Sequence, residues 1–111
     1  MNSFEENSRF GIYENTFLLM TEAFKSFTEI EKVIIYGSRA MGNHKKGSDI
    51  DLAIAGEKVD VHTVKKLSVA LNEELPLPYY FDVLDYHALA NPELTQHIDR
   101  EGQLLYSKER S

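Results

Sequence analysis

Residues 33–55 read VIIYGSRAMGNHKKGSDIDLAIA, and this stretch decides the fold. It begins with an apolar, mostly β-branched run that stops at Gly37, which predicts a buried strand that enters a tight turn. Ser38 stands where a short helical turn would begin, and residues 42–47 have the glycines and polar side chains of a loop. The chain is then expected to re-enter a strand at residues 48–49.

The Gly37–Ser38 step has the properties of a phosphate-binding turn. A glycine lets the backbone approach a ligand closely, and the free N–H groups of a following helical turn carry partial positive charge. The hydroxyl of Ser38 adds one more hydrogen-bond donor. The step can therefore hold phosphate oxygens.

Asp49 and Asp51 are expected to share one face of the second strand. Successive strand side chains point to opposite faces, so Ile50, Leu52 and Ile54 point the other way, into a core. Two desolvated like charges are costly unless a cation lies between them, and Mg²⁺ prefers oxygen ligands of this kind. A phosphate-binding turn followed by a carboxylate pair predicts a metal–nucleotide site.

The order of these motifs resembles a known family. Gly37-Ser38, ten intervening residues and then Asp49-x-Asp51 are similar to the signature of the polymerase-β-like nucleotidyltransferases. The flanking residues resemble in particular the minimal nucleotidyltransferases, which include the MntA-type antitoxins that are paired with a HEPN-domain protein. The resemblance covers about residues 30–86, the core of a single minimal nucleotidyltransferase domain expected over residues 1–111.

This resemblance implies a Mg²⁺-dependent transfer of a nucleoside monophosphate, with ATP as the donor. Asp49 and Asp51 would hold two Mg²⁺ ions. The acceptor would be a hydroxyl, that of a tyrosine, on a HEPN-domain partner with which the chain forms a hetero-oligomer. The nucleotide-binding residues implied on this basis are Gly37, Ser38, Arg39 and Ser48.

The predicted third strand, over residues 79–84, brings two further carboxylates near the pair. Asp82 and Asp85 are three positions apart, so in a regular strand they point to opposite faces and one of them can join the pair. Spacing alone leaves both open. In the resembled family the third carboxylate lies within a hydrophobic strand at the position of Asp82. The resemblance therefore implies Asp82 as the third metal ligand, and a capping or solvent-facing role for Asp85.

Two amphipathic helices are expected to cover the sheet. Apolar side chains recur at helical spacing from Tyr13 to Phe27, which predicts a first helix with one packed face. Asp60 is the predicted N-cap of a second helix, which ends at the Pro76–Pro78 break. The packed side of this helix is expected to hold Val61, Val64, Leu67, Leu71 and Leu75.

The remaining elements follow in the C-terminal third of the chain. Asn91-Pro92 predicts the start of a helix that stops at Gly102, and residues 103–107 are expected to add an edge strand. His87 and His97 lack metal-ligand spacing and are expected to pack or to face solvent. The predicted fold is α/β, with a small mixed sheet and helices packed on it.

Composition excludes several classes of function. The sequence has no cysteine, so it has no disulfide framework, thiol nucleophile or cysteine-based zinc site. A net charge of −6 argues against a nonspecific nucleic-acid-binding surface. Local positive charge nevertheless lies beside the turn, and Arg39 within it is a candidate for triphosphate contact. This charge comes from Arg39, His44, Lys45 and Lys46.

No apolar run approaches the roughly 18 residues that a membrane span needs, which predicts a cytoplasmic protein with no membrane partner. Two alternative functions stay open beside the antitoxin enzyme. The chain could be the nucleotidyltransferase subunit of an enzyme that modifies small molecules such as aminoglycosides, or a non-catalytic antitoxin that acts by binding. The three aspartates favour the antitoxin enzyme and the small-molecule enzyme over the antitoxin that acts by binding. The base preference, the acceptor hydroxyl and the stoichiometry do not follow from spacing.

Overall fold

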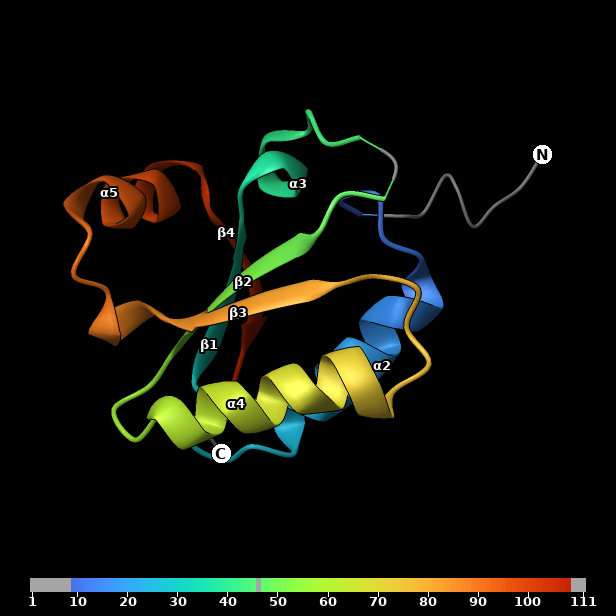
Figure 1. The fold of residues 1–111 in the computed structure, drawn as a ribbon, viewed down its shortest axis with the longest axis horizontal. Helices are drawn as coiled ribbons and strands as arrows, with labels where there is room; N and C mark the ends of the chain where they lie inside the picture. The colour runs from blue at the N-terminus through green and yellow to red at the C-terminus, as the bar shows by residue number, and fades with distance from the viewer. Residues whose placement is uncertain (1–8, 46, 109–111) are drawn as a thin grey trace.

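A computed structural model describes residues 9–45 and 47–108. These residues form a mixed four-stranded sheet in the order β3-β2-β1-β4 (Figure 1). The first strand is antiparallel to both β2 and β4, whereas β3 runs parallel to β2. The strands are β1 (Lys32–Tyr36), β2 (Ile50–Ala55), β3 (Phe81–Asp85) and β4 (Gln103–Ser107).

Helices cover both faces of this sheet. The main core lies between the sheet and two helices, α2 and α4, and a smaller core lies between the opposite face and α5. In Figure 1, α5 lies apart from α2 and α4 and beside the short helix α3. The helical elements are α2 (Glu14–Lys25), α3 (Ser38–Met41), α4 (Val61–Val69), the π-helical turn η1 (Ala70–Glu74), the 3-10 turn η2 (Tyr86–Ala88) and α5 (Pro92–Glu101).

The main core is built by strand alternation. Alternate residues of β1 and β2 are fully buried on the face that meets α2 and α4. Burial of each such side chain contributes about 1.5–3 kcal/mol, so this face supplies most of the stabilisation. The fully buried side chains include Met20, Val33, Ile35, Ile50, Leu52, Ile54, Leu67, Leu71 and Phe81.

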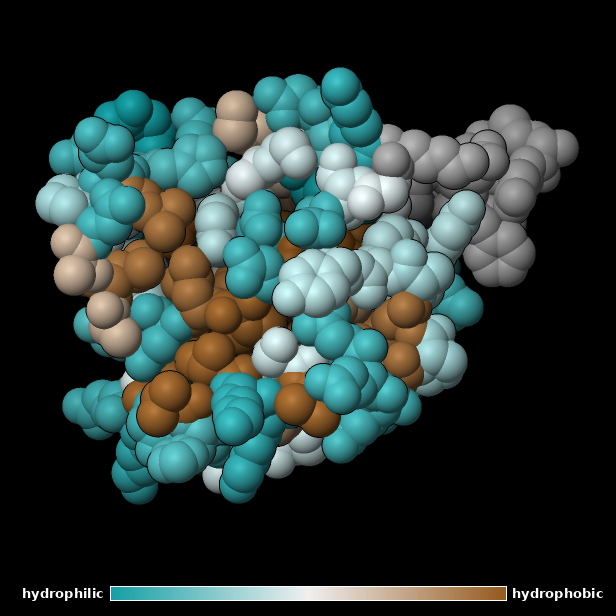
Figure 2. Space-filling view, viewed as in Figure 1, coloured by the Kyte–Doolittle hydropathy of each residue, from teal (hydrophilic) through white to brown (hydrophobic). Residues whose placement is uncertain are grey.

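The smaller core lies under α5. Ile98 of this helix is 2% exposed and packs with Tyr36 and Ala53, the latter from the middle of β2. Half-buried Leu84 and Leu94 border it. Figure 2 shows hydrophobic side chains at the surface between α4 and α5, so this second core is less completely covered than the first.

The predicted helix boundaries agree closely with the structure. The N-cap Asp60 is confirmed, because its side chain accepts hydrogen bonds from the N–H groups of His62 and Thr63 at 2.9 and 3.0 Å. The packed position predicted for Val61 is wrong, since this side chain is 72% exposed. At 100° per residue it lies about 120° around the helix from Leu67, outside the packed stripe.

Both strands that flank the predicted site begin later than expected. Strand β2 starts at Ile50 rather than at residues 48–49, and β3 starts at Phe81 rather than at residue 79. The start of β3 is fixed by Asn72, whose side chain bonds both the N–H and the carbonyl oxygen of Phe81 at 2.7 and 2.9 Å.

The C-terminal elements are confirmed: the Asn91 N-cap, the helix end before Gly102 and the edge strand β4. Within residues 9–45 and 47–108, no helix has the length and apolar character needed to cross a membrane.

Candidate active site

Three strands place one polar side chain each in a single row across the sheet. Tyr36 is the register partner of Asp51, and Asp51 is the register partner of Asp82. Register partners on neighbouring strands share a face, so the three side chains lie side by side on the face that α5 covers. The structure therefore brings together Asp51 of the predicted pair and Asp82 of the predicted third strand.

Gly37 follows directly on this row. Its backbone has φ 78° and ψ −155°, a conformation that residues with a side chain rarely adopt. A Cβ atom added here would lie 2.5 Å from Oδ2 of Asp51, so the glycine lets the turn approach the carboxylate. Ser38 comes next, half-buried, as the first residue of α3.

Two side chains of the row, Asp51 and Tyr36, are harder to ionise than usual. Burial raises the pKa of Asp51, and the nearby carboxylates of Asp82 and Asp49 raise it further. Arg39 acts in the opposite direction without reversing the shift. The pKa of the Tyr36 hydroxyl is likewise raised, first by burial and then by Asp51 and Asp82.

The donor atoms of the aspartates, but not their spacing in this structure, suit a hard divalent cation. Asp49, Asp51 and Asp82 offer carboxylate oxygens, and a cation would relieve the repulsion that adds to the effect of burial on the pKa of Asp51. The aspartates are near enough to interact electrostatically, but no group of three Asp, Glu or His side chains in the described parts of the chain is gathered around one point as the ligands of an ion. Asp49 lies just before β2 and is exposed, as is Asp82.

Asp85 has the capping role expected for it. Its register partner is Ile54, at the far end of the paired segment from Asp51. Its Oδ1 atom accepts a hydrogen bond of 3.1 Å from the N–H of His87, at the start of η2. This carboxylate therefore serves the strand end, whereas Asp82 belongs to the row.

Arg39 lies beneath the loop that joins α3 to β2. It is 3% exposed, and its Nε and Nη2 atoms donate to the carbonyl oxygen of Ser48 at 3.1 and 2.6 Å. Its Nη1 donates to the carbonyl oxygen of Phe10 at 2.8 Å, and the guanidinium lies 5.2 Å from the ring centroid of Tyr79. Burial lowers the pKa of Arg39. The contacts in the structure thus assign this side chain to the loop and the N-terminal segment.

Ser48 closes the same loop. Its Oγ accepts a hydrogen bond from the N–H of Lys45 at 3.0 Å. Direct contact of Arg39 or Ser48 with a nucleotide stays a prediction. Lys46, part of the predicted positive cluster, lies outside the described residues.

His97 is the site residue that sequence reasoning missed. Its Nε2 accepts a hydrogen bond from the N–H of Gly37 at 3.3 Å, and its ring meets the Tyr36 ring edge-on, with centroids 6.2 Å apart. The two hydrogen-bonded residues are 60 positions apart in the chain. No local spacing pattern could have revealed the contact.

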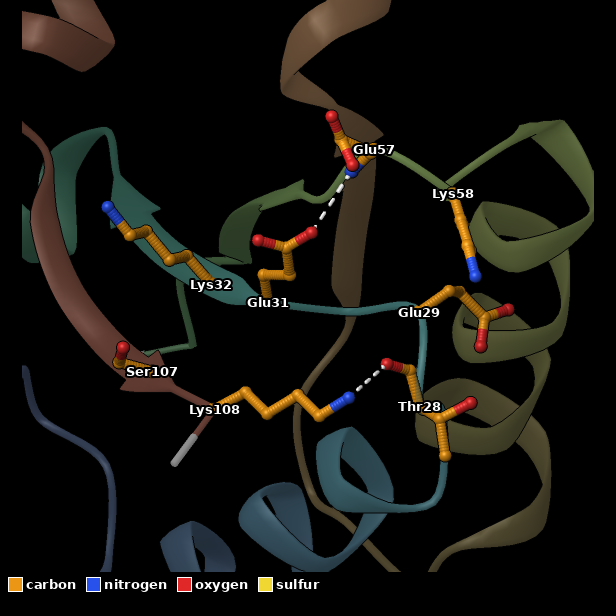
Figure 3. A pocket seen from close by; sticks show the side chains of 8 residues that line it. All are labelled: Thr28, Glu29, Glu31, Lys32, Glu57, Lys58, Ser107 and Lys108. Carbon is orange, nitrogen blue, oxygen red and sulfur yellow. Dashed lines mark hydrogen bonds between the residues drawn. The ribbon is translucent and has the colours of Figure 1, made fainter. Parts of the chain in front are cut away.

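A cavity of about 620 Å³ lies at the other end of β1 from the row. Figure 3 shows acidic and basic side chains around it, with Lys108 donating to the carbonyl oxygen of Thr28 at 2.8 Å and Glu31 accepting from the N–H of Glu57 at 3.2 Å. The cavity has neither the glycine turn nor facing carboxylates on neighbouring strands. The cavity therefore lacks the features from which the sequence predicts the site.

Comparison with known proteins points to one family. The family described as polymerase beta, nucleotidyltransferase matches residues 20–111 of the chain. No curated protein sequence matches it significantly.

Several solved structures are similar in fold. A toxin–antitoxin complex with AMP-PNP contains a chain at TM-score 0.65 and 22% identity, with 86% of this chain and 74% of that chain covered. A tri-AMPylated Shewanella oneidensis HEPN toxin in complex with MNT antitoxin gives 0.63 and 18%, covering 86% and 72%. A putative nucleotidyltransferase from Sulfolobus solfataricus gives 0.53 and 22%, covering 83% and 77%. At these identities the likeness concerns the fold.

Proposed function

The chain belongs to the polymerase-β nucleotidyltransferase family, and we propose that it transfers AMP from ATP to a side-chain hydroxyl of a HEPN-domain partner protein. The observation that carries this proposal is the row of Tyr36, Asp51 and Asp82 beside the close-approach turn at Gly37. Carboxylates on neighbouring strands, one of them with a raised pKa, suit a metal–triphosphate complex.

In this proposal Asp49 and Asp51 hold two Mg²⁺ ions, and Asp82 helps to hold one of them. The bound metal would neutralise triphosphate charge and lower the pKa of the attacking hydroxyl. Gly37 and Ser38 fix the β- and γ-phosphates, because the glycine permits close approach and the serine offers a hydroxyl donor. Arg39 supports binding by holding the loop at Ser48 in place.

The reaction is an in-line displacement. The acceptor oxygen forms a bond to the α-phosphorus, the bond from that phosphorus to the bridging oxygen breaks, and pyrophosphate leaves. The hydroxyl proton passes to solvent. The residues of this chain contribute by orientation and charge balance, which can lower the barrier of a reaction that needs the reacting atoms about 3–3.5 Å apart.

The partner is inferred from the proteins that this chain resembles in fold. One of them is an MNT antitoxin in complex with an AMPylated HEPN toxin, and another is a toxin–antitoxin complex with AMP-PNP. An added AMP group is bulky and anionic, so its attachment near the active site of a HEPN-type RNase would inactivate it. We propose a tyrosine as the acceptor and the cytoplasm, where ATP is available, as the location.

The test uses a HEPN-domain protein encoded in the same genome. Both purified proteins are incubated with ATP and Mg²⁺, and the intact mass of the partner is measured. We expect the mass to rise in AMP-sized steps with the wild-type chain and to stay constant with Asp49→Asn. Full inhibition of the partner without a mass change would instead support an antitoxin that acts by binding. Labelling of an added aminoglycoside would support the small-molecule enzyme.

A further inference from the structure

The C-terminal helix α5 reaches the turn at Gly37 through one side chain. Half-buried His97 accepts the Gly37 N–H through Nε2 at 3.3 Å and packs edge-on against Tyr36. We propose that His97 is a positioning residue of the nucleotide site, which holds Gly37 against the carboxylate of Asp51. This role rests on the function proposed above and deepens it.

The turn at Gly37 needs such a support. Glycine loses more conformational freedom on folding than any other residue, and this one has a backbone conformation that other residues rarely adopt. It has no side chain with which to anchor itself, and a Cβ would be 2.5 Å from Oδ2 of Asp51. A hydrogen bond to its N–H therefore fixes the peptide without occupying the space beside the carboxylate.

The helix that carries His97 is itself firmly held. Its first turn is capped by the Asn91 side chain, which accepts hydrogen bonds from two backbone N–H groups at 3.0 and 3.2 Å. The neighbouring residue, Ile98, is 2% exposed in the smaller core. Tyr86 donates to Oδ1 of Asp99 at 2.6 Å. The imidazole therefore projects from an element with a fixed position relative to the sheet.

The following strand secures the other end of α3. The side-chain Nε2 of Gln103 donates to the carbonyl oxygen of Ala40 at 2.8 Å. The segment formed by α5 and β4 thus contacts both ends of the short helix that follows the glycine, at Gly37 and at Ala40.

In this arrangement Gly37 and Ser38 have different roles in phosphate binding. The Gly37 N–H is taken by His97, so the glycine contributes close approach to the phosphates. The adjacent serine contributes the donors. Loss of the imidazole acceptor should loosen the turn and weaken ATP binding, with a smaller effect on the chemical step once ATP is bound.

The experiment compares three variants. His97→Phe keeps a ring against Tyr36 but has no acceptor, whereas His97→Gln keeps an acceptor. His87→Phe is the matched control, because His87 is an exposed histidine that also meets a tyrosine ring edge-on, that of Tyr86. Circular dichroism confirms folding, and His97→Leu replaces His97→Phe if that variant does not fold.

The first readout is the Gly37 amide itself, in protein without nucleotide. Tyr36–Gly37 is the single Tyr–Gly pair in the sequence, so ¹³C-carbonyl tyrosine with ¹⁵N-glycine isolates one NMR signal. A hydrogen bond contributes about 1 kcal/mol, so we expect hydrogen exchange at Gly37 to become about fivefold faster in His97→Phe. His97→Gln and His87→Phe should exchange like the wild type.

The second readout is the affinity for ATP with Mg²⁺, measured by calorimetry, together with KM and kcat. In His97→Phe we expect the dissociation constant and KM to rise about fivefold and kcat to change by less than about twofold, with rescue in His97→Gln. Unchanged Gly37 exchange and ATP affinity in His97→Phe would overturn the role of His97 while leaving the proposed function standing. A wild-type chain that does not bind ATP would overturn the proposed function and this role with it, even if Gly37 exchange responded as expected.

Discussion

Two clusters of acidic side chains lie at opposite ends of β1, and they differ in the charged residues around them. At the Tyr36 end, Asp51 and Asp82 lie side by side on neighbouring strands, and burial and neighbouring carboxylates raise the pKa of Asp51. At the Lys32 end, glutamates line the 620 Å³ cavity together with three lysines. The cavity residues are Thr28, Glu29, Glu31, Lys32, Glu57, Lys58, Ser107 and Lys108.

Two of the glutamates at the cavity, Glu29 and Glu31, also have hydrogen-bond donors. Glu31 accepts from the N–H of Glu57, and Glu29 accepts from the hydroxyl of Thr63 at 2.9 Å. In the row, by contrast, burial and the neighbouring carboxylates of Asp82 and Asp49 raise the pKa of Asp51. The raised pKa of Asp51 therefore supports the proposal that the site lies at the row and not at the cavity.

The largest expected effect comes from removing one negative charge from the row, compared with the same change at the cavity. Asp51→Asn should lower nucleotidyl transfer by about 10³-fold, because it removes a carboxylate on which charge stabilisation at the α-phosphate depends. Glu57→Gln, the same chemical change at the cavity, should leave transfer unchanged. Turnover is measured as pyrophosphate release in the presence of the partner. Equal losses in both variants would remove the distinction between the two ends.

A smaller effect is expected within β3. Asp82→Ala should lower transfer by at least about 10²-fold, since the side chain belongs to the row. Asp85→Ala should retain activity, because that carboxylate caps η2, and it should lose only about 1 kcal/mol of stability. Both are followed by the same release assay and by thermal melting. The reverse order of activities would mean that Asp85 is the third ligand.

The smallest expected effect is on stability. The folded-state pKa of Asp51 is raised above its ordinary value of 3.8, so its stabilising contribution is present below that pH and is lost as the pH rises through the folded-state pKa. Without metal at pH 7, Asp51→Asn should therefore melt a few degrees above the wild type. The difference should vanish in acid.

Added Mg²⁺ should raise the melting temperature of the wild type at pH 7 and have little effect on Asp51→Asn. Glu57→Gln provides the control, and it should respond to Mg²⁺ like the wild type. A metal response that survives in Asp51→Asn would place the cation elsewhere.

Most of the fold could be predicted from the sequence because its signals are local. Strand alternation, the Asp60 and Asn91 caps and the stop at Gly102 each depend on neighbouring residues, and the structure confirms them. The strand starts were wrong by one or two residues, since they depend on contacts such as that of Asn72 with Phe81.

The site residues likewise differ in whether local sequence could predict them. Gly37 and Asp51 lie within one short motif, and the structure brings them into contact distance of each other. Asp82 needed the resemblance to a family, because spacing could not separate it from Asp85. Two hydrogen bonds depend on the packing of distant segments, which no local pattern encodes. They join His97 to Gly37, and Arg39 to the carbonyl oxygen of Ser48.

The most direct test of the central claim is where a divalent ion binds. Mn²⁺ takes the place of Mg²⁺ together with a non-hydrolysable ATP analogue, and the paramagnetic broadening of two glycine amides is compared. Gly37 adjoins the row, and Gly56 lies at the end of β1 that borders the cavity. The pairs Tyr36–Gly37 and Ala55–Gly56 each occur once in the sequence, so each amide can be labelled separately. Substoichiometric Mn²⁺ should erase the Gly37 signal and leave the Gly56 signal sharp. Broadening of the Gly56 signal before the Gly37 signal, or of both signals together, would contradict the proposal that the metal–nucleotide site lies at the row.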